Sequence, residues 1–410
     1  MKLSCGNWVD GERFWDRKDD MVLLRKRIEE GNHILLVAQR RMGKTSLMHE
    51  LARQVGGRFT CLFVDVQKAA TAADAVVELS LATRQVKSLW GKTRDLFANI
   101  LGQIAENVEE VTINDLGFKL RGGLNAGNWS EKGDQLFSIL AASDKPVLLL
   151  MDEVPILVNR LLKNENGEVT PDGKKLADQF MSWLRANSIK HQGRVRIILS
   201  GSIGLEPVLN QAGLSASLNT FSPFELKPWD EPTAEGCLNE LAAEYGIKFA
   251  PGATTEIVKR LGCCIPHHVQ MFFSHIHDRC IRRKRMEFFK DEVDEIYTSE
   301  MLSIRGHAEL THYEERLKLV LGEKRFPLAS EMLTEAAVSG KLGKDALAAL
   351  RKLYPDVGGS EAQREILQVL EHDGYLRIEN GEYTFVSRLL RDWWRKRNEL
   401  FFVPILERSI

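Results

Sequence analysis

The stretch His33–Leu51, HILLVAQRRMGKTSLMHEL, decides how the rest of the chain is interpreted. Apolar residues from Ile34 to Ala38 predict a buried strand. They stop at Gln39–Gly43, and a helical pattern begins at Lys44. A buried strand that runs through a loop into a helix gathers backbone N–H groups and the positive end of a helix dipole at one place. The stretch therefore predicts an anion-binding loop.

The loop fits a known phosphate-binding pattern, G-x-x-x-x-G-K-[ST], with alanine in the first glycine position. Gly43 lets the backbone approach the phosphates, Lys44 can reach the β- and γ-phosphates, and the Thr45 hydroxyl can bind Mg²⁺. We therefore expect ATP and Mg²⁺ as cofactors. The residues expected to bind them are Ala38, Gln39, Arg40, Arg41, Met42, Gly43, Lys44, Thr45 and Ser46.

Composition and charge narrow the class of protein. A chain of 410 residues with 44% hydrophobic residues is expected to fold into two or three domains. Its 56 basic and 57 acidic residues give no overall positive field toward nucleic acid or an anionic membrane. The first 13 residues carry no apolar signal segment, and the apolar runs are too short to span a membrane. The six cysteines lack framework spacing, so we expect a reducing, cytoplasmic location without membrane contact.

The first half of the chain alternates short apolar runs with helical patterns, which predicts an α/β fold with a parallel sheet. The predicted strands are Ile34–Ala38, Cys61–Val66, Val147–Met151 and Val195–Leu199. The predicted helices are Thr45–Val55, Ala72–Leu101, Gly133–Ala142 and Lys174–Ser188, and Thr112–Trp129 is expected to be less regular. After Phe221-Ser222-Pro223 only helices are expected, so we place a domain boundary there.

Two acids end the third predicted strand, in VLLLMDE (Val147–Glu153). Unpaired carboxylates at a strand end cost desolvation unless they face a cation. We expect Asp152 to hold Mg²⁺ through water and Glu153 to act as general base on the attacking water. The alternative is a helix N-terminus that is merely enriched in acids.

The fourth predicted strand ends in RIILSGS, where Ser200 or Ser202 is expected to lie beside the γ-phosphate. An ordinary strand-end turn is the alternative. No arginine finger is evident, because Arg185, Arg194 and Arg196 can equally be solvated side chains. Intrinsic hydrolysis is then expected to be slow.

In their order along the chain, six segments resemble the archaeal-type ATPase branch of the STAND and AAA+ P-loop NTPases. They are ERFWDRKDDMVLL, AQRRMGKTSLM, VLLLMDE, IILSGS, LGCCIPHHVQ and GEYTFVSRLLRDWW. The resemblance implies an ASCE-type αβα core at residues 1–225, a helical lid at 226–290, and a helical linker with a winged-helix domain at 291–410. It also implies kinship with origin-recognition ATPases, and nucleotide contacts from Arg17 and Pro266. Asp16 stands where relatives often have glycine, and Gly262-Cys263-Cys264-Ile265-Pro266 replaces their Gly-Gly-x-Pro.

The segment Cys263–Cys280 is rich in histidine and cysteine, so a zinc site is one candidate for it. On a helix, His268 and His275 share a face while His277 and Cys280 lie elsewhere, which favours a plain helix with partly buried histidines. Cys263, Cys264, His267 and His268 remain the candidate ligands of the alternative.

The C-terminal third predicts a winged helix, with helices at Ala329–Val338, Lys344–Leu353 and Glu361–His372 and a hairpin at Asn380-Gly381. The helix in the recognition position carries Glu361, Glu365, Glu371 and Asp373 against Arg364, so phosphate repulsion opposes DNA binding. The basic segments RRKR (Arg282–Arg285) and RDWWRKR (Arg391–Arg397) lie elsewhere, and tryptophans at helical spacing are typical of a core.

These features predict a Mg-ATP-dependent ATPase that acts as a conformational or assembly switch, through self-association or a protein partner. One alternative is a DNA-binding ATPase that loads or remodels a nucleoprotein. The other is a nucleotide-binding scaffold without turnover.

Overall fold

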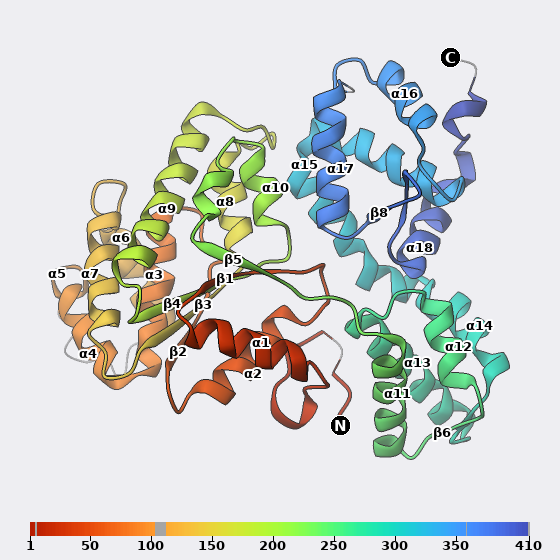
Figure 1. Ribbon diagram of the computed structural model, residues 1–410, viewed down its shortest axis with the longest axis horizontal. Helices are drawn as coiled ribbons and strands as arrows, with labels where there is room; N and C mark the ends of the chain where they lie inside the picture. Colours follow the sequence, from red (N-terminus) through yellow and green to blue (C-terminus); the bar gives the residue numbers. More distant parts are fainter. Residues whose placement is uncertain (5, 103–111, 358, 409–410) are drawn as a thin grey trace. The chain divides into compact units, whose positions relative to one another are not determined.

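The chain folds into two compact units, drawn in Figure 1 from a computed structural model that describes residues 1–4, 6–102, 112–357 and 359–408. The sheet unit consists of Arg17–Val37 and Leu47–Glu225. The helical unit consists of Met1–Asp16, Ala38–Ser46 and Leu226–Ile410. The predicted phosphate loop, Ala38–Ser46, therefore belongs to the helical unit, although it directly follows the first strand of the sheet in the chain.

Within the described residues, the sheet unit is built on a five-stranded parallel sheet in the order β2-β3-β4-β1-β5. The strands are β1 (His33–Val37), β2 (Thr60–Asp65), β3 (Val147–Asp152), β4 (Val195–Leu199) and β5 (Phe221–Glu225). β4 separates the loop-bearing strand β1 from the acid-bearing strand β3. The predicted α/β class, with its ASCE-type arrangement of strands, is confirmed.

The fifth strand differs from the prediction, because Phe221-Ser222-Pro223 is typical of a boundary between domains. Proline has no N–H for the sheet ladder and is tolerated on edge strands. β5 is such an edge: it pairs only with β1 in the sheet order, and Pro223 lies opposite Leu35. The sheet therefore extends one strand past β1.

Helices cover both faces of the sheet; in Figure 1, α1 and α2 lie on one side and α8, α9 and α10 on the other. Two expectations were wrong in detail. The long helix expected over Ala72–Leu101 is broken near Thr83 and Phe97. The stretch after Thr112, which was expected to be less regular, contains the helix α6. The Thr112 side chain caps this helix by accepting the Asp115 N–H at 3.2 Å. The helices are α1 (Lys18–Glu29), α2 (Lys44–Val55), α3 (Ala72–Ala82), α4 (Lys87–Leu96), α5 (Ala98–Leu101), α6 (Ile113–Gly123), α7 (Trp129–Ala141), α8 (Val154–Leu162), α9 (Pro171–Lys190) and α10 (Leu205–Asn210).

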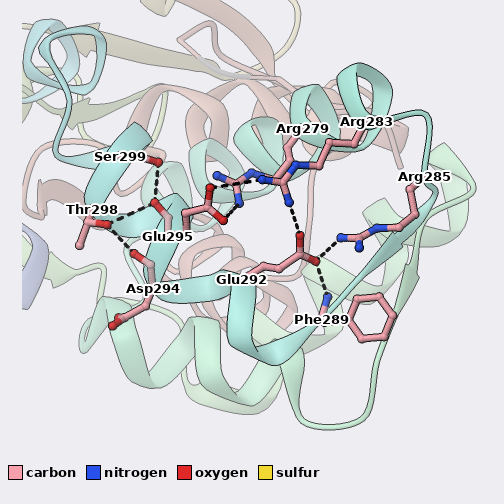
Figure 2. Close-up of polar contacts among 9 residues, drawn as sticks. All are labelled: Arg279, Arg283, Arg285, Phe289, Glu292, Asp294, Glu295, Thr298 and Ser299. Atoms are coloured by element: carbon pink, nitrogen blue, oxygen red, sulfur yellow. Dashed lines mark hydrogen bonds and ion pairs between the residues drawn. The ribbon is translucent and has the colours of Figure 1, made fainter.

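The helical unit continues with helices and one short parallel strand pair that the sequence did not predict. These elements are α11 (Glu231–Tyr245), β6 (Lys248–Phe249), α12 (Ala253–Leu261), α13 (Pro266–Arg283), β7 (Glu287–Phe288) and α14 (Val293–Ile296). An ion-pair cluster joins the end of α13 to α14 (Figure 2). Glu292, which is 8% exposed, accepts from Arg283, Arg285 and the Phe289 N–H, and Glu295 accepts from Arg279 and Arg283. No helix among the described residues is long and apolar enough to cross a bilayer.

The C-terminal module, residues 304–408, combines helices with an antiparallel hairpin. Its elements are α15 (Ile304–Val338), interrupted by non-helical backbone at Gly322, then α16 (Lys344–Leu353), α17 (Ser360–His372), β8 (Leu376–Glu379), β9 (Glu382–Phe385) and α18 (Arg388–Asn398). Asn380 and Gly381 both have positive φ, as the predicted hairpin turn requires. Trp393 and Trp394 are buried, and the Trp394 indole donates to Thr334 at 3.0 Å, so both belong to the core.

His33, the first residue of β1, is a buried histidine held neutral by its surroundings. Its Nδ1 accepts the Ile197 N–H at 3.1 Å, which leaves Nε2 to donate to the Ser188 carbonyl at 3.1 Å. The pKa of His33 is lowered from 6.5 to about 4, mainly by burial; the hydrogen bond to Ser188 opposes the shift, and the charge of Arg196 adds to it. A polar bridge therefore joins β1, β4 and the end of α9.

This bridge predicts a pH-dependent stability. Between pH 6.5 and about 4, unfolding lets His33 take up a proton that the folded chain excludes. The histidine's contribution should be complete above pH 6.5 and should fall by about 3 kcal/mol as the pH drops through that window. The measurement is the free energy of urea unfolding against pH for the parent and for His33→Asn, whose amide oxygen can still accept the Ile197 N–H. Parallel pH profiles for the two proteins would contradict the assignment.

Candidate phosphate loop and acidic strand ends

The loop after β1 has the backbone of an anion-binding turn. Arg41 and Gly43 take positive φ values of 68° and 87°, which reverse the chain before α2 begins at Lys44. The Lys44 ammonium turns back into the loop and donates to the carbonyls of Ala38 at 2.7 Å and Gln39 at 2.9 Å. Lys44 is only 8% exposed. Its charge is therefore held at the centre of the loop by two carbonyl oxygens.

Three further predicted ligands lie at helix starts. The Ser46 hydroxyl, in the first turn of α2, accepts the Val9 N–H at 3.0 Å and so ties the N-terminal segment to this turn. Thr45 precedes it and is partly exposed. Arg17 caps α1 from a left-handed conformation with φ 66°, is 8% exposed, and forms an ion pair with Asp20 at 3.3 Å.

The carboxyl ends of β2 and β3 place acids side by side. Asp65 and Asp152 are register partners across the two strands. Burial raises the pKa of Asp65 and the neighbouring Asp152 adds to that rise, although the Gln67 N–H opposes it by donating to the Asp65 carboxylate at 2.8 Å. Asp152 itself is buried and accepts the Glu153 N–H at 3.0 Å. Two neighbouring carboxylates at a strand end provide the oxygen donors that a hard divalent cation prefers.

Glu153 is held in a defined position by the turn after β4. It occupies the cap of α8 in a left-handed conformation with φ 60°. One carboxylate oxygen accepts both the N–H and the hydroxyl of Ser202, each at 2.9 Å. Gly201 makes this approach possible, because a Cβ there would lie 2.4 Å from the Pro155 ring. Ser202 therefore orients the predicted general base.

Ser200, the other predicted sensor, has a hydroxyl available for a further contact. It is 1% exposed, and its Oγ makes no hydrogen bond to any of the described residues. Its backbone is fixed by pairing with Met151 at 2.9 Å and with Val154 at 3.2 Å. A buried polar atom without a partner costs free energy, which a water or ligand oxygen would recover. The sheet unit thus gathers Asp65, Asp152, Glu153, Ser200 and Ser202 at adjoining strand ends.

The donor chemistry of these segments fits Mg-ATP. The loop offers an ammonium, backbone N–H groups at the start of α2 and the Thr45 hydroxyl; the strand ends offer carboxylates and one buried hydroxyl. Phosphate oxygens suit the first set and a hydrated magnesium ion suits the second. Asp65 was missed as a candidate, although its place at a strand end was visible in the sequence.

Pro266 and the histidine-rich segment lie in the helical unit. Pro266 is the first residue of α13, where its lack of an N–H is tolerated, and it is buried. His267, His268 and Cys264 are buried as well, and Cys263 is partly buried. Among the described residues, no group of three or more His, Cys, Asp or Glu side chains lies close enough together to hold a metal ion.

Comparison with known proteins supplies the fold. Neither a family model nor a curated protein matches the chain. The Walker-type ATPase PABY2304 of Pyrococcus abyssi superposes with a TM-score of 0.60 at 16% identity, over 95% of this chain and 98% of that one. The Aeropyrum pernix ORC2 protein, in ADPNP and ADP complexes, superposes with a TM-score of 0.56 at 12% identity, over 96% and 97%. The chain therefore has the P-loop NTPase fold, a parallel α/β sheet followed by a helical C-terminal part.

Proposed function

We propose that the protein is a Mg-ATP-dependent ATPase that uses its nucleotide to switch conformation. The observation that carries the proposal is that one chain has both a lysine-centred loop after β1 and the acids Asp152 and Glu153 after β3, with β4 between these two strands in the sheet order. Lys44 and the backbone of the loop would bind the phosphates. Thr45 and Asp152 would hold Mg²⁺, which neutralises phosphate charge when bound.

Glu153 is the residue proposed to act on water. Its carboxylate is fixed by Ser202 through one oxygen, and the second oxygen can accept a proton from a water molecule. Ser200 would donate its buried hydroxyl to a phosphate oxygen. Because no residue of this chain is assigned as an arginine finger, slow intrinsic turnover is part of the proposal.

We infer that the C-terminal module is a winged helix that contacts protein rather than DNA. Its basic residues are compensated within the chain: Arg395 pairs with Glu399 at 2.7 Å, Arg397 with Glu314 at 3.1 Å, and Arg391 with Asp392 at 2.7 Å. In the run Arg282–Arg285, Arg283 and Arg285 pair with Glu292 (Figure 2), and Arg282 lies 4.0 Å from Asp278. DNA would have to compete with these carboxylates, which weakens its electrostatic attraction. We therefore favour self-association or binding of a protein partner as the step that the conformational switch controls.

The first test separates binding from hydrolysis. Lys44→Ala should weaken ATP binding by at least about tenfold, because it removes the charge that meets the phosphates. Glu153→Gln should bind ATP within about threefold of the parent but lose about 100-fold in turnover, because only the carboxylate can accept a proton. Calorimetry and phosphate release measure the two quantities. Glu206→Gln, an exposed acid on α10, is the control; turnover of Glu153→Gln at the parent rate would refute the base assignment.

The second test concerns the switch. With Glu153→Gln holding ATP unhydrolysed, we expect a different mass by light scattering and a different protease sensitivity near Pro228 than with ADP or without nucleotide. The physical reason is that only a differential contact with the γ-phosphate can shift a conformational population. Identical masses and cleavage patterns in all three states, at saturating nucleotide, would leave a nucleotide-binding scaffold as the better description.

The third test addresses the DNA-binding alternative. The arginines of α18 are paired with acids but remain partly exposed, so they are the residues through which DNA would bind. We expect duplex DNA to leave ATP turnover unchanged at about 150 mM salt, a concentration at which surface charges are well screened. Stimulation that falls steeply with salt, and that Arg395→Ala and Arg397→Ala remove while Arg364→Ala does not, would replace the protein-contact interpretation by DNA binding.

A further inference from the structure

Tyr313, on α15, is a buried phenol whose hydroxyl has no hydrogen-bond partner among the described residues. It is 3% exposed. The buried tyrosines Tyr297 and Tyr375 differ in this respect: their hydroxyls donate to Asp392 at 2.9 Å and to the Tyr313 carbonyl at 2.6 Å. Leaving a buried hydroxyl unsatisfied costs free energy. A group from outside the chain that accepted a hydrogen bond from Tyr313 would recover that cost.

Residues of the phosphate loop act on the Tyr313 phenol. Arg40 and Arg41 of the phosphate loop act electrostatically on the phenol, and Cys263, three residues before Pro266, lies near it as well. Burial raises the pKa of Tyr313 well above neutrality although the two arginines oppose the shift, so the hydroxyl keeps its proton. A protonated phenol O–H can donate to an oxygen of a phosphate chain bound at this loop.

The C-terminal module holds Tyr313 at the loop by two further contacts. The Gln39 side chain rests on Gly374, where a Cβ would lie 2.0 Å from Gln39 Cδ; Gly374 has φ 77°, which also favours glycine. The next residue, Tyr375, donates to the Tyr313 carbonyl and packs edge-on against the Tyr313 ring, with centroids 5.9 Å apart. The backbone and ring of Tyr313 are thus positioned by the residues that contact the loop.

We propose that the Tyr313 hydroxyl donates a hydrogen bond to the phosphate chain of the nucleotide, so that α15 supplies a ligand-binding residue from outside the α/β core. This inference rests on the proposed nucleotide binding and adds to it a direct link between the ligand and the C-terminal module. Because the contact is made to phosphate, it distinguishes ATP and ADP from adenosine.

The test is calorimetric titration of the full chain with Mg-ATP, Mg-ADP and adenosine. Tyr313→Phe should weaken ATP or ADP binding by about tenfold, and adenosine binding should not change, because only the phosphates lose a donor. Without ligand, Tyr313→Phe should unfold at the same or higher denaturant concentration, since the lost hydroxyl had no partner. Tyr297→Phe is the matched control: it removes a bonded hydroxyl, so it should lower stability and leave the affinities unchanged.

The outcomes separate this inference from the proposed function. A parent chain that binds neither ATP nor ADP would overturn both. A parent chain that binds them with the same affinity as Tyr313→Phe would overturn the Tyr313 contact and leave the ATPase proposal standing. As a second measurement, 3-fluorotyrosine at position 313 should shift its ¹⁹F signal on adding Mg-ADP but not adenosine. A signal that is unmoved by Mg-ADP would also overturn the contact.

Discussion

The turn between β1 and α2 is the constraint on which the proposed chemistry depends. Its positive φ values at Arg41 and Gly43 bring the start of a helix over the end of a buried strand, and Lys44 is folded back onto the carbonyls of Ala38 and Gln39. The ammonium and the backbone N–H groups at the start of the helix are donors that suit the oxygens of a phosphate chain, which is why the turn has the properties of a ligand site as well as of a structural connection.

Much of the sheet unit could be predicted because its signals are local. β1–β4 are short, largely apolar runs; β2 and β3 end in Asp65 and Asp152, and Ser200 follows β4. β5 escaped prediction because Pro223 is a breaker in sequence, and only its edge position makes it acceptable. The helix α6 also escaped prediction, because its glycines weaken the helical pattern. The Thr112 cap that begins this helix is a local signal, but it was overlooked in the sequence.

Within the candidate site, individual residues could be predicted from the sequence, but the contacts between them could not. Asp152 and Glu153 were chosen by their place after a strand, whereas the bond between Glu153 and Ser202 joins turns 49 residues apart. Tyr313 could not be found at all, since nothing local marks a tyrosine on a long helix as a neighbour of a loop some 270 residues earlier. Such contacts are set by tertiary packing, and only there does an unsatisfied hydroxyl become visible.

Hydrogen exchange of the intact chain tests the central claim, that nucleotide bound at the loop is also sensed by the C-terminal module. Amide protection would be followed in Gln39–Thr45, around Tyr313 and around Tyr375 while Mg-ADP is titrated. Both the loop and the two tyrosine segments should gain protection with the same midpoint, because one ligand stabilises contacts in all three. Protection confined to the loop at saturating Mg-ADP, with unchanged exchange around Tyr313 and Tyr375, would contradict the account.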